Sequence, residues 1–196
     1  MKVNIDDSLK EQGVHTSVKK RKLSFDEIRF NLFAYLEDYS KMGFSFVKAG
    51  NELLEIRKEL DRYTLFGQCF LGYFVISQKN QIFLICNPEG VEVFQKPRIF
   101  VNHSLQAFVS SYSLFMSAVF LLKSKFYKSQ AYQAEEIATD LMNKVADLEE
   151  PIEQELTFWE HIAYLIEDDG IVLRDDLFHI LNKGYETLEC WLLNPA

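Results

Sequence analysis

The stretch of sequence that decides the fold runs from residue 65 to residue 115 and reads LFGQCFLGYFVISQKNQIFLICNPEGVEVFQKPRIFVNHSLQAFVSSYSLF. Two apolar runs, Phe70–Ile76 and Gln81–Cys86, flank four polar residues, which predicts a β-hairpin. Asn87-Pro88-Glu89-Gly90 has the residues of a type I turn, and Val91–Phe94 is then the expected returning strand. The stretch therefore predicts a three-stranded antiparallel meander.

A long helix is expected directly after this meander. Ile99–Val101 predicts a short edge strand, and either Asn102 or Ser104 can cap the helix that follows. Large apolar side chains recur at helical spacing from Leu105 to Phe120, so we expect the helix to pack on the sheet. The segment 104–122 carries no charge, but its serines and Gln106 interrupt the apolar run and favour a core helix over a membrane span.

Helical patterns precede and follow this central region. Capping-box spacing at Ser24 and an apolar face predict a helix that ends near Gly43. A second helix is predicted with Asn51 as its cap and Leu53, Ile56 and Leu60 on one face. Beyond Lys128 the apolar spacing predicts helices over 134–148, 152–166 and 175–183.

These elements together predict an α+β fold, a mostly antiparallel β-sheet (meander) flanked by helices, with a helical C-terminal part. Residues 1–23 are polar and aperiodic and are expected to form a flexible N-terminal arm. Residues 24–196 are long enough for one core, so we predict a single domain with a helical C-terminal extension.

The three cysteines, Cys69, Cys86 and Cys190, are far apart and form no C-x-x-C motif, so we expect buried thiols rather than a disulfide framework or a zinc site. The first 22 residues contain no apolar run of the kind that a signal peptide needs. Both observations lead us to expect a cytoplasmic protein.

The sequence contains no recognisable catalytic, nucleotide-binding or metal-binding motif. There is no G-x-S-x-G, S-x-x-K, G-x-G-x-x-G, P-loop or H-E-x-x-H pattern. Asp175 and His179 would share a helix face but supply only two ligands, and His103-Ser104 fits a helix entrance better than a catalytic pair. We therefore expect no metal site and no bound cofactor.

The distribution of charge is more informative. Residues 1–128 hold 18 Lys and Arg against 13 Asp and Glu, whereas residues 129–176 hold only Lys144 and Arg174 against 14 Asp and Glu. An ordinary solvated helical face is one explanation, and a surface that attracts a cationic protein is the other. The excess of negative charge in residues 129–176 disfavours direct binding of nucleic acid. The candidate partner-binding residues are Glu135, Glu136, Asp140, Asp147, Glu149, Glu150, Glu153, Glu155 and Glu160.

The order of elements resembles the SUKH superfamily. The residues that carry the resemblance are Leu71–Ser77, Gln81–Cys86 and the step Phe100-Val101-Asn102-His103-Ser104-Leu105-x-x-Phe108 into a helix, which looks most like the fourth subfamily of bacterial immunity proteins. Glu155–Trp159 is similar to the C-terminal region of that group. The resemblance covers about residues 25–167, and Gly43-Phe44-Ser45 stands where Gly-Leu-Pro is often found.

The resemblance implies an α+β fold and a non-enzymatic immunity protein that binds and neutralises a cognate polymorphic toxin, typically a nuclease or a nucleic-acid deaminase. The expected partner is then a cationic toxin domain or another basic protein, with neither nucleic acid nor membrane bound directly. Two alternatives stay open, namely an adaptor or regulatory scaffold of the same superfamily and an enzyme with an unrecognised pocket.

Overall fold

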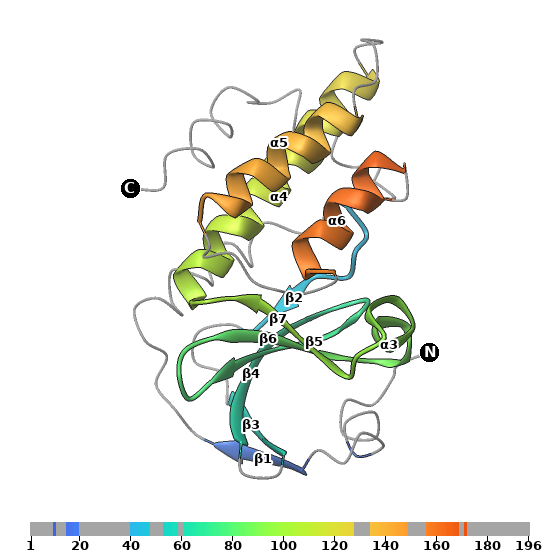
Figure 1. Ribbon diagram of the computed structural model, residues 1–196. Helices are drawn as coiled ribbons and strands as arrows, with labels where there is room; N and C mark the ends of the chain where they lie inside the picture. The colour runs from blue at the N-terminus through green and yellow to red at the C-terminus, as the bar shows by residue number, and fades with distance from the viewer. Residues whose placement is uncertain are drawn as a thin grey trace. The chain divides into compact units, whose positions relative to one another are not determined.

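The computed structural model describes residues 10, 15–19, 40–47, 53–58, 61–127, 134–148, 156–168 and 171. The chain divides into two compact units (Figure 1). The first contains the β-sheet and one short helix, and the second contains the helical part from Ala107 onward together with residues 40–42. The prediction that residues 24–196 form a single domain stays a prediction.

The first unit is built on one antiparallel sheet. Within the described residues it has seven strands in the order β1-β3-β4-β5-β6-β7, with β2 paired to β4. The strands are β1 (His15–Lys19), β2 (Ser45–Phe46), β3 (Leu53–Lys58), β4 (Asp61–Cys69), β5 (Gly72–Ser77), β6 (Ile82–Cys86) and β7 (Arg98–Asn102). With the helices described below, this sheet confirms the predicted α+β class. β1 lies inside the segment predicted as an arm, and it pairs with β3.

The predicted hairpin is β5 and β6, and its turn is held by side-chain chemistry. Ser77 Oγ accepts hydrogen bonds from the amides of Lys79 and Gln81 at 3.3 and 3.1 Å. Asn80 adopts a left-handed backbone (φ 62°), which asparagine tolerates better than most residues. The hairpin prediction is therefore confirmed, and so is the edge segment Ile99–Val101, which belongs to β7 at the end of the strand order.

The predicted strand Val91–Phe94 is wrong, because Pro88–Phe94 forms helix α3. Asn87 caps this helix, since its side-chain oxygen accepts from the Gly90 amide at 2.8 Å, and Pro88 occupies a first-turn position that needs no amide hydrogen. Gly90 packs closely against the turn between β4 and β5, and a Cβ at Gly90 would be 2.1 Å from the Leu71 carbonyl oxygen in that turn. These contacts turn the expected type I turn into the first turn of a helix.

The predicted second helix over Leu53–Leu60 is also wrong, because Leu53–Lys58 forms β3. Leu54 and Ile56 lie in register with Leu65 and Tyr63 of β4, while Glu55 and Arg57 alternate with them on the opposite face. Glu55 and Arg57 form an ion pair at 2.9 Å. The pairing of these residues with β4 therefore assigns the segment to the sheet.

The two faces of the sheet bury different sets of side chains. One face carries the apolar cluster Ile56, Tyr63, Leu65, Tyr73, Val75 and Ile85. The alternate residue Phe74 points to the other face, where its ring stacks with those of Phe44 and Phe66 at 5.9 and 6.0 Å. The sheet therefore has apolar residues buried on both sides.

The second unit contains α4 (Leu105–Tyr127), α5 (Ala134–Ala146) and α6 (Phe158–Glu167). α4 begins directly after Ser104, one of its two predicted caps, and α5 confirms the helix predicted over 134–148. The predicted helix 152–166 starts later than expected, because Thr157 caps α6 and Leu156 lies before it. α5 and α6 pack against each other.

α4 is the one helix of the described chain that is long and apolar enough to cross a membrane, over Leu105–Leu122. The protein buries 61% of this window, as expected for a core helix of a folded domain. Two of the serines that interrupt it bond within the helix, because Ser113 Oγ donates to the Val109 carbonyl at 2.8 Å and Ser117 Oγ to the Ser113 carbonyl at 3.0 Å. The predicted helix beginning at Asp175 lies outside the described residues. The predicted helix beginning at Ser24 also lies outside them, except for its end near Gly43.

Candidate functional site

The described part of the predicted acidic surface lies mainly on α5. Glu135, Glu136, Asp140 and Asp147 are all exposed, and the buried side of the helix is formed by Ala134, Ile137, Ala138, Leu141 and Val145. Glu136 and Asp140 are four residues apart on one face of α5. Asp147 follows directly after Ala146, the last residue of the helix, and its amide donates to the Asn143 carbonyl at 3.1 Å. We call Glu136, Asp140 and Asp147 the α5 acidic row.

Two of the predicted acidic residues also have partners within the protein. Asp140 Oδ2 accepts from Lys144 Nζ at 2.8 Å, one helical turn away. Glu160 belongs to the capping box of α6, in which its side chain accepts from the Thr157 amide at 2.7 Å and its amide donates to Thr157 Oγ1 at 3.2 Å. Glu135 and Glu136 lie in the first turn of α5, where the helix dipole favours negative charge.

The other four predicted residues, Glu149, Glu150, Glu153 and Glu155, lie outside the described residues. The structure thus brings Glu136 and Asp140 onto one face of α5, places Asp147 directly after its end, and gives Glu160 a structural role. A part in partner binding stays a prediction for all nine residues.

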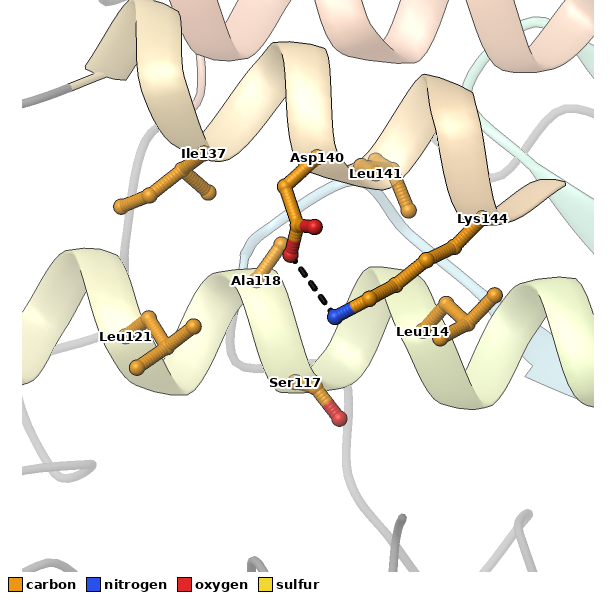
Figure 2. Close-up of a pocket in the computed structure, with 8 residues that line it drawn as sticks. All are labelled: Leu114, Ser117, Ala118, Leu121, Ile137, Asp140, Leu141 and Lys144. Atoms are coloured by element: carbon orange, nitrogen blue, oxygen red, sulfur yellow. Dashed lines mark hydrogen bonds and ion pairs between the residues drawn. The ribbon is translucent and has the colours of Figure 1, made fainter.

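A small pocket lies beside the α5 acidic row, between α4 and α5, with a volume of about 80 Å³ (Figure 2). Its walls are mostly apolar and come from Leu114, Ala118, Leu121, Ile137 and Leu141. Three polar residues, Ser117, Asp140 and Lys144, complete the lining. In Figure 2 the Asp140–Lys144 ion pair lies between the two helices, among these apolar side chains.

The described residues offer little chemistry for catalysis. They contain no group of three or more His, Cys, Asp or Glu that could hold a metal ion. Cys69 and Cys86 are buried as expected, and burial raises the pKa of the Cys86 thiol to about 12, which keeps it protonated at neutral pH. Burial lowers the pKa of His161.

Of the residues considered from sequence as catalytic or metal-binding candidates, the structure describes only His103 and Ser104. His103 lies against the ring of Phe100, with centroids 4.8 Å apart, at the entrance to α4. Asp175, His179 and Cys190 lie outside the described residues.

Sequence reasoning missed the pocket and a polar cluster formed by residues of β4, β6 and β7. In that cluster the Arg98 guanidinium lies 4.9 Å from the centre of the Phe83 ring, and its Nη1 is 3.4 Å from Asp61 Oδ2. Arg98 also donates to the Tyr63 hydroxyl, whose pKa is raised by burial. The Arg98–Asp61 pair joins strands far apart in the sequence, and no periodic pattern marks it.

Comparisons with known proteins add no relative, since no family model, no curated protein and no solved structure matches the chain. The resemblance to the SUKH superfamily therefore stays a prediction.

Proposed function

We propose that this protein is a non-enzymatic immunity protein that binds and neutralises a cognate toxin domain acting on nucleic acid. The observation that carries the proposal is the α5 acidic row, which consists of two exposed carboxylates on one face of α5 and a third directly after its last residue, within the most acidic segment of the chain. The sequence resemblance to immunity proteins of the SUKH superfamily points in the same direction.

The electrostatic argument connects this surface to a class of partner. A nuclease or deaminase must attract phosphate groups, so it presents a basic surface around its substrate channel. An acidic protein surface is complementary to that basic surface and speeds association through long-range attraction. The same carboxylates repel nucleic acid, so the protein would bind the enzyme rather than its substrate.

The pocket between α4 and α5 also favours a protein partner. Sites for small-molecule substrates typically have volumes of about 300–1,000 Å³. The volume of this pocket is about 80 Å³, enough for one side chain of a partner but not for a typical metabolite. The proposed place of action is the cytoplasm of the cell that makes the toxin.

Co-expression tests the proposal directly. The gene next to the one for this protein should encode a secreted protein whose C-terminal domain is lethal when expressed alone, and co-expression of this protein should restore growth. A C-terminal domain that is harmless alone, or that still kills in the presence of this protein, contradicts the proposal. Binding at nanomolar or lower Kd is expected for immunity, whereas micromolar binding with exchange of partners would favour the adaptor alternative.

The role of the α5 acidic row can be measured separately. Glu136→Gln combined with Asp147→Asn should lower the association rate about threefold or more at low salt and reduce its salt dependence. The matched control is Glu89→Gln combined with Glu92→Gln, which removes the same charge from exposed positions on α3 in the other unit. Equal effects of the two pairs would mean that only the net charge of −8 matters.

A further inference from the structure

We propose that the pocket between α4 and α5 receives one aliphatic side chain from a basic segment of the partner, and that Asp140 binds a cationic residue beside it. This inference rests on the proposed function and names the contact that would anchor the complex. It also specifies the chemistry of the partner segment, an aliphatic residue next to a lysine or an arginine.

The volume of the pocket determines the size of the anchor. An apolar cavity of roughly 150 Å³ lined by leucine, isoleucine and phenylalanine holds a benzene molecule. The pocket here is about 80 Å³, so a side chain of three or four carbons, such as valine or leucine, matches it. Pockets that are filled by one buried anchor are where binding energy concentrates in protein interfaces.

The chemistry of the walls favours an apolar anchor. Leu114, Leu121, Ile137 and Leu141 present hydrocarbon to the pocket from both helices. Ser117 is the polar residue on the α4 side, and its hydroxyl already donates to the Ser113 carbonyl at 3.0 Å. An aliphatic side chain would therefore displace water without removing a hydrogen bond from the protein.

The ion pair in the pocket supplies the contact for the cation. The carboxylate of Asp140 and the ammonium of Lys144 are 2.8 Å apart, but their side chains are 58% and 47% exposed. An exposed pair of this kind adds little stability, so a partner cation can replace Lys144 at small cost. Glu136 on the same helix face and Asp147 directly after the helix increase the attraction for that cation.

The charge of the chain argues against a second copy as the occupant. The net charge of −8 disfavours close approach of two acidic faces, whereas a basic segment is attracted to them. Self-association in solution that disappears when the pocket is filled would show that a second copy occupies it, and would overturn the inference.

The test uses the full chain and, as the probe, the lethal C-terminal domain encoded by the neighbouring gene. Ser117→Leu introduces a larger aliphatic side chain at a position that lines the pocket, and Thr139→Leu adds the same side chain at an exposed position of α5 that does not line it. Ser117→Leu should raise the Kd tenfold or more, mainly through faster dissociation, while Thr139→Leu should change it less than twofold. Unchanged affinity of a folded Ser117→Leu variant overturns the inference.

Two exposed substitutions keep the test decisive if Ser117→Leu does not fold. Asp140→Asn should raise the Kd fivefold or more, and Lys144→Ala, which releases Asp140 from its internal partner, should leave the Kd unchanged or lower it. Unchanged affinity of Asp140→Asn, or weaker binding by Lys144→Ala, overturns the cation contact. If the unmodified protein does not bind the domain, the proposed function fails. If the unmodified protein binds but the Kd values of the pocket variants do not change as expected, the inference alone fails.

Discussion

Replacement of Asn87 tests how the short helix α3 is fixed to the sheet. The Asn87 side chain accepts from the Gly90 amide at 2.8 Å and donates to the Phe70 carbonyl at 2.7 Å, and its backbone amide donates to the Leu71 carbonyl at 3.0 Å. Asn87→Ala removes both side-chain bonds and leaves the backbone bond in place. Loss of the cap costs about 1 kcal/mol and loss of the second bond about 1 kcal/mol more, or about 2 kcal/mol together.

Asn87→Asp separates the two contributions. Aspartate keeps the oxygen that caps the helix but has no amide hydrogen for the Phe70 carbonyl, so about half of the loss should remain. Equilibrium unfolding in urea, followed by circular dichroism, measures both variants. For a chain of this size, a loss of 1 kcal/mol in the free energy of unfolding lowers Tm by about 2–4 °C, so Asn87→Ala should lower Tm by about 4–8 °C.

Two results would refute this reasoning. A free energy of unfolding for Asn87→Ala within about 0.5 kcal/mol of the unmodified protein would mean that the cap is not needed, since changes away from named structural features usually fall within that range. Equal destabilisation by Asn87→Asp would mean that the cap contributes nothing and that only the bond to Phe70 counts.

Three further predictions concern stability and reactivity. Gly72→Ala should prevent folding in an expression assay, because its Cβ would lie 2.1 Å from the Ile85 carbonyl oxygen at φ 151°. Burial lowers the pKa of His161 in the folded protein, so below the ordinary histidine pKa of 6.5 the unfolded chain binds more protons than the folded protein. The free energy of unfolding should therefore fall as the pH drops below 6.5. His161→Gln should flatten this pH dependence in urea titrations. Cys86, with a pKa of about 12, should resist iodoacetamide at pH 8 until urea unfolds the protein, as mass spectrometry of the labelled peptide would show.

The sequence predicted those elements whose pattern is long or locally determined. α4 and α5 repeat their apolar spacing over several turns, and β5 and β6 meet at a turn fixed by its own residues, Ser77 and Asn80. Patterns of this kind need no information from distant parts of the chain.

The two wrong assignments concern short segments decided by contacts that the sequence does not show. α3 has seven residues, and its cap Asn87 bonds to a carbonyl seventeen positions earlier. β3 has six residues. In this segment the three-residue spacing of Leu53 and Ile56 is typical of a helix, while the two-residue spacing of Leu54 and Ile56 is typical of a strand. Pairing with β1 and β4 decides between the two periods, so the tertiary contact overrides the local pattern.

The candidate site could be predicted only in part for a similar reason. Charged residues on an amphipathic helix are exposed, so the positions of Glu136 and Asp140 on one face follow from their spacing and from the apolar residues between them. The pocket depends on how closely α4 and α5 approach each other, which small side chains such as Ala118 influence. Spacing along one helix contains no information about that approach.

The predicted acidic residues are expected to differ in whether their replacement changes stability or binding. Glu160 binds the Thr157 amide in a capping box, so its replacement should lower the stability of α6. Glu136 and Asp147 have no ion pair with another described residue, so their replacement should leave stability nearly unchanged and should appear in association rates if the acidic surface binds a partner. Asp140 lies between these cases, because its ion pair with Lys144 adds little stability while its position at the pocket makes it the acidic residue whose loss should most increase dissociation.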